Sequence, residues 1–255
     1  MNMNLVIDIG NTRSKFFLFA EKEGQMLAHK VADGSSLREL EEFTMNEIQS
    51  SEDKITGAIV SSTVDISSEA RSRLDALPYP VLYFTPDIPI PIGNQYATPN
   101  TLGTDRLAAA IGAWSQQEGH PLLVIDAGSC ITIDFVSAQG SYMGGNISPG
   151  LHMRLQSMYE HAAHLPMVDA EGDLPDVGYN TETAIRAGAI LGIRHEIEGY
   201  IKAFRRKYPD LLVFLTGGDA KRLAITQTSR TFADDFLVPK GLNAILEHVI
   251  TMNQD

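Results

Sequence analysis

The sequence contains a single cysteine, Cys130, among 255 residues. One thiol excludes an internal disulfide and a cysteine-rich zinc site, and such scarcity is typical of a reducing compartment, so we expect a cytoplasmic protein. Positive charge is also scarce, because 20 lysine and arginine residues face 32 aspartate and glutamate residues, for a formal charge of −12. This balance argues against binding of nucleic acid or an anionic membrane as the main function. It leaves nucleotide binding open, since that depends on local loops.

Long apolar runs are absent as well. No stretch approaches the roughly 18 apolar residues of a transmembrane helix, because the best candidate, from Leu122, soon reaches Asp126. The first residues, Met1–Leu5, lack a basic group and their apolar stretch ends at Asp8, which is unlike a signal peptide. Apolar residues still make up 44% of the chain, enough to bury a core. At about 100–200 residues per domain, the length predicts one large or two modest domains.

Two glycine-rich nucleotide signatures are missing. The chain has no Gly-x-x-x-x-Gly-Lys-Ser/Thr motif, which excludes a P-loop enzyme. It also has no Gly-x-Gly-x-x-Gly motif after a strand, which weakens a dinucleotide-binding interpretation. Any phosphate site has to be built from other turns.

What the sequence does contain is an internal repeat. The segment Leu5–Gly10 (LVIDIG) recurs close to half a chain later as Leu123–Gly128 (LVIDAG). Each segment is followed by a polar turn and an alternating strand, Lys15–Phe19 in the first copy and Ile131–Phe135 in the second, so each copy predicts a β-hairpin. Two such hairpins indicate two similarly built domains; a chance likeness between two apolar strands is the alternative.

The remaining patterns fit two α/β halves. The junction falls near Gly119–Pro121, which gives domains 1–118 and 119–255. The proline-rich run Pro86–Pro99 is expected to be a loop, since proline does not fit a helix interior. Alternation of helices and strands predicts α/β layers. We expect helices at 37–50, 70–77, 104–117 and 242–252, and strands at 55–61, 81–84 and 211–215. A further long helix is expected to be capped by Asn180 or Thr181 and to run to about Lys207.

Both copies of the repeat place an aspartate at the end of the apolar strand, Asp8 and Asp126. A carboxylate in such a strand is costly to bury unless it is paired or bound to a cation. The turns beside them offer backbone N–H groups and short polar side chains, Asn11, Thr12 and Ser129, which can cradle phosphate oxygens. A carboxylate there suits Mg²⁺. Two facing hairpins could grip a nucleoside triphosphate; the alternative is that each aspartate caps its own turn.

Other charged residues have ordinary interpretations beside functional ones. Arg13 and Lys15 should share a face of the returning strand, where Lys15 either contacts phosphate or is a solvated strand end. The acidic stretch Asp169–Asp176 lacks the spacing of a calcium loop and predicts a mobile surface loop. Three histidines match no zinc signature and are expected to be solvated or capping residues: His152, His161 and His164.

Five short motifs follow one another along the chain: Asp8–Thr12 (DIGNT), Tyr96–Arg106 (YxxPxxLGxDR), Asp126–Asp134 (DxGxxxTxD), Gly144–Gly150 (GGxIxPG) and Thr216–Asp219 (TGGD). In this order the motifs resemble those of type III pantothenate kinases, a family of the acetate and sugar kinase, chaperone and actin superfamily. One departure is Gly-Ser-Cys at 128–130, where the family usually has Gly-Thr-Ala; serine keeps the hydroxyl, but phosphate contacts could differ.

The resemblance implies an α/β fold of duplicated actin-like (ribonuclease H-like) domains with a nucleotide cleft between them. It also implies ATP-dependent phosphorylation of pantothenate to 4′-phosphopantothenate, the first step of coenzyme A biosynthesis. The alternatives are another small-molecule kinase or phosphohydrolase of the same superfamily, or a non-catalytic regulatory relative.

For the substrate site, the resemblance assigns the catalytic base to Asp105, which from sequence alone reads as a carboxylate stabilised by a helix N-terminus. Arg106 resembles the family's substrate-gripping arginine, and a surface arginine is the alternative. Thr181 resembles a threonine that completes the substrate site, reaching across a dimer interface, with Thr183 as the second choice. The expected substrate-binding residues are Tyr96, Gly103, Thr104, Asp105, Arg106 and Thr181.

For the nucleotide site, the resemblance implies that Asp8 holds Mg²⁺ through water and that Asp126 ligates a monovalent cation, K⁺ or NH₄⁺. Asp134 would support the second turn. A homodimer is implied by the family and by Gly188 and Gly192, which would let another backbone approach the long helix closely. The expected ATP-binding residues are Asp8, Ile9, Gly10, Asn11, Thr12, Arg13, Ser14, Lys15, Ser129, Gly145, Gly217 and Gly218.

Overall fold

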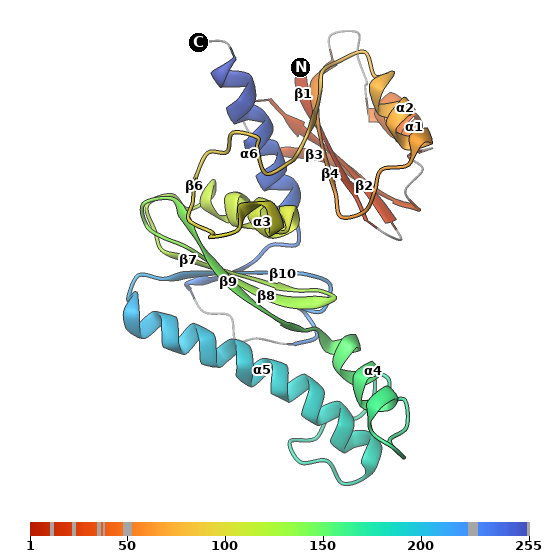
Figure 1. Ribbon diagram of the computed structural model, residues 1–255, viewed down its shortest axis with the longest axis vertical. Helices are drawn as coiled ribbons and strands as arrows, with labels where there is room; N and C mark the ends of the chain where they lie inside the picture. Colours follow the sequence, from red (N-terminus) through yellow and green to blue (C-terminus); the bar gives the residue numbers. More distant parts are fainter. Residues whose placement is uncertain are drawn as a thin grey trace. The chain divides into compact units, whose positions relative to one another are not determined.

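A computed structural model of the chain (Figure 1) shows two compact units. Unit 1 comprises Met1–Gln117 together with Phe236–Asp255, and unit 2 comprises Glu118–Asp235. Among the residues that the structure describes, no helix has the length and apolar character needed to cross a bilayer. The described residues are 1–10, 13–21, 24–34, 37, 39–47, 53–223 and 229–253.

Unit 1 is built on a sheet with the strand order β3-β2-β1-β4-β5. β2 runs antiparallel to β1 and to β3, whereas β4 runs parallel to β1 and to β5. Its strands are β1 (Asn2–Ile9), β2 (Arg13–Ala20), β3 (Met26–Asp33), β4 (Lys54–Ser62) and β5 (Val81–Tyr83), and the short β6 (Gly93–Asn94) follows.

Helices cover both faces of this sheet. Alternate residues of β1 point to opposite sides, so Leu5 and Ile7 pack in one apolar core with Leu40 and Leu74 of the first two helices. On the other face, Asn4 donates a hydrogen bond to Asn243 of the last helix at 2.9 Å. The helices are α1 (Leu40–Glu47), α2 (Ser68–Asp75), the 3-10 turn η1 (Pro99–Thr101), α3 (Thr104–Trp114) and α6 (Leu237–Met252).

The C-terminal helix α6 belongs to unit 1, which differs from the expected division at 118/119. It crosses α3 so closely that a Cβ on Gly112 would overlap the Leu237 carbonyl oxygen, and one on Gly241 would overlap that of Ala108. α6 also begins earlier than expected, because Pro239 lies in its first turn, where proline is tolerated. The amphipathic pattern of α6 predicts a buried face but does not say which unit buries it.

Unit 2 repeats the topology of unit 1. Its strands are ordered β11-β10-β7-β8-β9, with β8 antiparallel to β7 and to β9, and β10 parallel to β7 and to β11. β7 therefore takes the place of β1, and β10 that of β4, which confirms the two predicted hairpins and the duplicated α/β architecture. The bounds are β7 (Leu122–Ala127), β8 (Cys130–Val136), β9 (Ser141–Pro149), β10 (Leu212–Thr216) and β11 (Thr231–Ala233).

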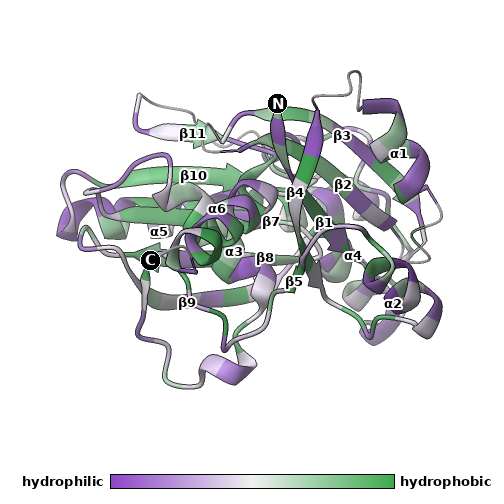
Figure 2. Ribbon diagram, turned by 90° about the horizontal axis from the view of Figure 1, so that it is seen from above, coloured by the Kyte–Doolittle hydropathy of each residue, from purple (hydrophilic) through white to green (hydrophobic). Residues whose placement is uncertain are grey.

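The long helix α5 (Thr181–Lys207) runs along this sheet (Figure 1). Its apolar face, with Ile193 and Ile197, packs against β7 residues Leu123 and Ile125 in the core of unit 2. Figure 2 shows β10 as hydrophobic along its length, as expected for a strand in the middle of a sheet. The shorter helix α4 (Leu151–His161) follows β9 directly.

Candidate functional site

Asp8 is the next-to-last residue of β1, at the edge where the parallel strands β1 and β4 end. It is paired in register with Lys15 on β2 and with Ser61 on β4. The Lys15 Nζ lies 3.6 Å from Asp8 Oδ2, and only 18% of the Asp8 side chain is exposed. The first repeat therefore holds a mostly buried carboxylate beside one exposed cation.

The start of β2 alternates as predicted. Arg13 and Lys15 are exposed and share a face, whereas Ser14 is buried. The Ser14 hydroxyl donates a hydrogen bond to the Gly34 carbonyl at 2.7 Å. Its side chain thus serves the interior of unit 1 and is not available to a ligand at the turn.

The turn between β1 and β2 is closed by the Gly10 N–H, which donates to the Arg13 carbonyl at 2.9 Å. The Ile9 side chain is fully buried, so only its backbone can take part in binding. Asn11 and Thr12, the other expected phosphate ligands, lie outside the described residues.

The electrostatics of Asp8 link it to the start of α3. Burial raises the pKa of the Asp8 carboxyl, the positive charge of Lys15 lowers it, and the Asp105 carboxylate raises it further. The Asp105 carboxylate is therefore close enough to act on Asp8, and both residues belong to unit 1. Two carboxylates in one partly buried site favour a cation between or beside them.

The N-terminus of α3 is shaped around Asp105. One carboxylate oxygen of Asp105 accepts the Arg106 N–H at 2.8 Å. A Cβ on Gly103 would lie 2.5 Å from that same oxygen, so a side chain at this position would displace the carboxylate. The Thr104 hydroxyl is 3.5 Å from that of Ser61, at the end of β4. These contacts dock the helix start at the strand ends that carry Asp8.

Arg106 and Tyr96 complete this group. The Arg106 side chain is buried, with its guanidinium carbon 5.8 Å from the centre of the Tyr96 ring, within cation–π range. The Tyr96 N–H donates to Asn94 Oδ1 at 3.0 Å, which fixes the loop that carries the ring. Of the expected substrate residues, the structure brings together those that belong to unit 1: Tyr96, Gly103, Thr104, Asp105 and Arg106.

Asp126 occupies the matching position in unit 2. It is the next-to-last residue of β7 and is paired in register with Thr216 of β10. A Cβ on Gly128 would lie 3.2 Å from the Asp126 carboxylate, and one on Gly217 would overlap it. Gly217 also has φ +94°, a conformation that favours glycine. The two glycines thus leave room for the carboxylate between the turn and the end of β10.

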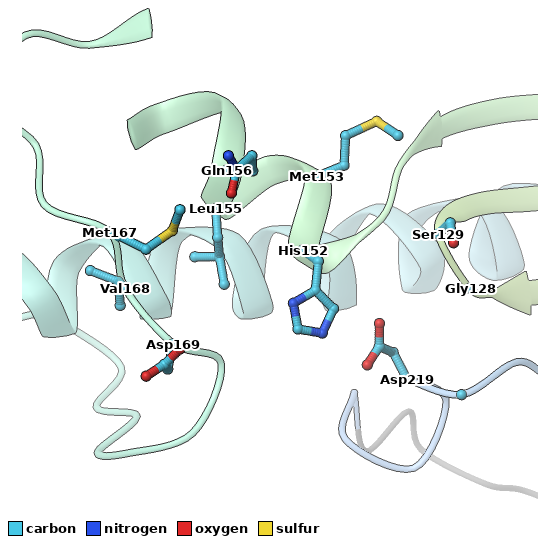
Figure 3. A pocket seen from close by; sticks show the side chains of 11 residues that line it. Gly128, Ser129, His152, Met153, Leu155, Gln156, Met167, Val168, Asp169 and Asp219 are labelled. Atoms are coloured by element: carbon cyan, nitrogen blue, oxygen red, sulfur yellow. The ribbon is translucent and has the colours of Figure 1, made fainter. Parts of the chain in front are cut away.

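A cavity of about 720 Å³ lies beside the second hairpin (Figure 3). Its lining comes from the β7–β8 turn, the first turns of α4, the segment 167–169 and the loop after β10. In Figure 3 the side chains of His152 and Asp219 point toward one another across it. The lining residues are Gly128, Ser129, His152, Met153, Leu155, Gln156, Met167, Val168, Asp169, Gly218 and Asp219.

Two walls of this cavity are held by specific contacts. The Gly150 N–H donates to the Ser129 carbonyl at 3.1 Å, which ties the start of α4 to the second turn. On the other side, the buried Arg186 donates from Nε to the Asp169 carbonyl at 2.9 Å and from Nη1 to the Asp173 carbonyl at 3.0 Å. The acidic stretch expected to be a mobile loop is thus anchored at its backbone by an interior guanidinium.

Gly145 does not line this cavity. A Cβ on Gly145 would overlap the carboxylate of buried Asp134, which accepts a hydrogen bond from the Tyr142 hydroxyl at 2.7 Å. Gly145 instead lines a separate cavity of about 330 Å³ with Lys207 and Tyr208 at the end of α5. Gly145 and Gly218 therefore line different cavities. Asp134 bonds to Tyr142, away from the turn that it was expected to support.

At the start of α5, the structure separates the two candidate threonines. The Asn180 side chain accepts the Thr183 N–H at 2.9 Å, and the Thr183 hydroxyl accepts the Asn180 N–H at 3.2 Å, which forms a capping box. Thr183 is buried by this role, whereas Thr181 is exposed. A Cβ on Gly188 would meet no atom within 4 Å, so no described part of the chain makes the expected close approach there.

His152 and Asp219 are cavity residues that sequence reasoning did not assign to a site. A signal did exist for Asp219, because it follows a glycine pair at the carboxyl end of a parallel strand, where ligand-binding groups collect in α/β sheets. For His152 we find no such signal. Among the described residues, no group of three or more His, Cys, Asp or Glu side chains is arranged to hold a metal ion on its own.

Comparisons with known proteins agree with this geometry. A model of the type III pantothenate kinase family matches residues 4–203. A type III pantothenate kinase of Bacteroides fragilis is 47% identical over 246 residues, which cover 96% of this chain and 98% of that protein.

Solved structures agree on the fold. A protein of Campylobacter jejuni described as a Baf family transcriptional activator has a TM-score of 0.58 at 22% identity and covers 98% of both chains. A ROK family glucokinase of Streptomyces griseus has a TM-score of 0.50 at 11% identity and covers 98% of this chain and 99% of its own. At these identities the likeness shows the fold alone, which is that of duplicated actin-like domains.

Proposed function

The chain belongs to the type III pantothenate kinase family, and from this premise we propose that it transfers the γ-phosphoryl group of ATP to the primary hydroxyl of pantothenate. The product would be 4′-phosphopantothenate, at the entry to coenzyme A biosynthesis, and we place the reaction in the cytoplasm. Membership implies the use of ATP with a metal ion and a small-molecule acceptor. The observation that carries the proposal is the grouping of Asp105, Arg106 and Tyr96 at the start of α3, close enough to Asp8 for the Asp105 carboxylate to raise its pKa.

Asp105 would orient and deprotonate the attacking hydroxyl. In the transfer, a bond forms between the hydroxyl oxygen and the γ-phosphorus, the bond from that phosphorus to the β-phosphate oxygen breaks, and the proton passes to the Asp105 carboxylate. The Asp105 side chain is exposed and held by the Arg106 N–H, so it is available to a bound alcohol. The Arg106 guanidinium would pair with the carboxylate of pantothenate, for which its planar fork is suited.

The donor set around Asp8 fits Mg²⁺. Its carboxylate is mostly buried and its pKa is raised by burial and by Asp105, so a divalent cation would relieve both effects. A bound Mg²⁺, held through water, would supply neutralisation of the triphosphate charge. Lys15 and Arg13, on the exposed face of β2, would contact phosphate oxygens.

Asp126 fits a monovalent cation. Gly128 and Gly217 leave its carboxylate a space that side chains would fill, and K⁺ or NH₄⁺ bound there would add positive charge beside the phosphates. The nucleoside would occupy the cavity between Ser129 and the loop that carries Gly218. This arrangement requires the two hairpins to face a common nucleotide cleft, which is part of the proposal.

We further propose a homodimer in which Thr181 reaches the substrate site of the second copy. Thr181 is exposed because Asn180 and Thr183 form the helix cap. Two nearby apolar side chains, Val177 and Tyr179, are 81% and 70% exposed, and the open face of Gly188 lies two turns along the helix. A second copy would cover these groups.

The direct test is coupled ADP release with pantothenate, measured with and without K⁺. Asp105→Asn should reduce kcat by about 10²–10⁴-fold while ATP binding stays largely intact. Asp210→Asn is the matched control, because its carboxylate is 76% exposed at the start of β10, the end opposite to the proposed site. Normal turnover of Asp105→Asn would refute its role, and full ADP release without pantothenate would identify a phosphohydrolase instead.

A further inference from the structure

The cavity beside the second hairpin has a polar centre between two unlike ends. In Figure 3, Ser129 of the β7–β8 turn lies at one end, and the apolar Met167 and Val168 lie at the other. His152 and Asp219 lie between them. A ligand with phosphate at the first end and an apolar planar group at the second would present its middle to Asp219.

Hydrogen bonds of its backbone fix Asp219 beside the β7–β8 turn. Its N–H donates to the Ala127 carbonyl at 2.9 Å, and its carbonyl accepts the Leu223 N–H at 3.0 Å. Gly217, two residues before Asp219 and at φ +94°, packs against Ala127 so closely that a Cβ would overlap that residue. The backbone of Asp219 is therefore attached to the end of β7 on one side and to the following turn on the other.

The Asp219 carboxylate keeps acceptor capacity for a ligand. Its side chain is 15% exposed, and the Nε of Arg222 lies 3.8 Å from its Oδ1, too far for a hydrogen bond. Arg222 donates instead to the Glu171 carboxylate. An ionised carboxylate offers about four lone-pair positions, so two neighbouring hydroxyl groups can bind to it.

We propose that Asp219 binds the 2′- and 3′-hydroxyls of the donor nucleotide's ribose and so selects ribonucleotides over deoxyribonucleotides. The assignment rests on the proposed use of this cavity for ATP. Ribose is the part of a nucleotide that joins phosphate to base, so it falls at the middle of the cavity when phosphate is at Ser129. Hydroxyl-to-carboxylate hydrogen bonds are short and strong, and an acidic residue likewise binds the ribose hydroxyl in dinucleotide-binding folds. The base would then lie between Met153 and Met167.

The test is a thermodynamic cycle in which both the residue at position 219 and the hydroxyl groups of the ribose are varied. Calorimetry on the full chain with Mg²⁺ would measure dissociation constants for ATP, 2′-deoxy-ATP and 3′-deoxy-ATP, with wild type, Asp219→Asn and Asp219→Ala. The wild type should bind ATP about 10-fold more tightly than either deoxynucleotide. In Asp219→Ala this ratio should fall close to one, and Asp219→Asn, which keeps the shape, should retain part of it. A purely structural role would weaken all three ligands equally.

Asp169→Asn is the matched control, since it alters another carboxylate of the same cavity, at the other end in Figure 3. Its preference for ATP should equal that of the wild type. Equal binding of all three nucleotides by the wild type, or an unchanged ratio in Asp219→Ala, would overturn the proposal. If the ratio behaves as expected but pantothenate is not phosphorylated, the proposed function fails and the ribose assignment stands. If the wild type binds no nucleotide, both fail.

Discussion

The two hairpins share a topology but surround their aspartates differently. Asp8 and Asp126 are each next to last on the first strand, and each is paired with a buried hydroxyl on the parallel neighbour, Ser61 and Thr216. The antiparallel neighbour differs: in the second hairpin a threonine stands where the first has Lys15.

The turns differ as well. Residues 10–13 connect the paired ends of β1 and β2, whereas the shorter segment 128–130 connects β7 and β8. Gly150 packs against Gly128 and Ser129 of the shorter turn, and Gly217 packs against Asp126 and Ala127 just before it. Duplication thus preserved the position of the carboxylate, while the neighbours that decide which cation it suits diverged.

Exchanging each aspartate for asparagine should separate the two sites most strongly. Asp8→Asn should lower kcat/KM for Mg²⁺–ATP by about 10²–10³-fold, as for loss of one preorganised charged group at the phosphates. Asp126→Asn should lower it by about 10-fold and should abolish the response to K⁺. Steady-state kinetics across a K⁺ series would measure both, with Asp210→Asn as the control. Equal losses with equal K⁺ dependence would contradict the division of roles.

Glycine substitutions should show how closely the second turn is packed. Gly217→Ala would place a Cβ onto the Asp126 carboxylate at φ +94°, so it should destabilise the protein by about 1–3 kcal/mol. Gly218→Ala is a neighbouring control, since its Cβ would meet no atom within 4 Å. Thermal unfolding of both variants measures the difference. A Gly217 variant as stable as the Gly218 variant would show that the turn can move away.

The sequence predicted those elements whose signals are local. The hairpins were readable because two similar apolar strands each end in Asp-x-Gly. The start of α5 was narrowed to a cap at Asn180 or Thr181, and the structure shows Asn180 in that role. The strand β9 was missed because Gly144, Gly145 and Pro149 interrupt its pattern. Position 145 has no room for a side chain because the carboxylate of Asp134, on the neighbouring strand β8, lies against it. β3, α4 and β11 were not expected either.

The candidate site was predicted only where its residues belong to local motifs. Asp8 and Asp105 were named from motifs, and the effect of the Asp105 carboxylate on the pKa of Asp8 became visible only with the sheet and α3 in place. His152 and Asp219 meet across a cavity whose walls come from four separate segments, which no single spacing encodes. The membership of α6 in unit 1 depends on Gly112 and Gly241, which are far apart in the chain.

The raised pKa of Asp8 predicts a pH-dependent stability that should distinguish it from a salt-bridged surface aspartate. Because burial raises the pKa in the folded state above 3.8, the protonated carboxyl favours folding. That stabilisation is fully present below the unfolded pKa and is lost as the pH rises through the folded pKa. Without Mg²⁺ or nucleotide, Asp8→Asn should therefore raise Tm at neutral pH and have little effect at low pH. A lower Tm for Asp8→Asn at neutral pH would contradict this account.

Substitution of Lys15 should have the smallest effect on catalysis, because its side chain is 48% exposed and its Nζ lies 3.6 Å from Asp8 Oδ2. Lys15→Gln removes the charge that lowers the pKa of Asp8 and a cation on the face expected to meet phosphate. The KM for Mg²⁺–ATP should rise by about 3-fold, the size expected for an exposed charge pair, with kcat nearly unchanged. Added salt should raise the KM of the wild type more than that of the variant, since screening acts on the same interaction. Arg13→Gln, on the same exposed face but not paired with Asp8, tests whether the effect is specific to the carboxylate: only the Lys15 variant should shift the pH dependence of binding.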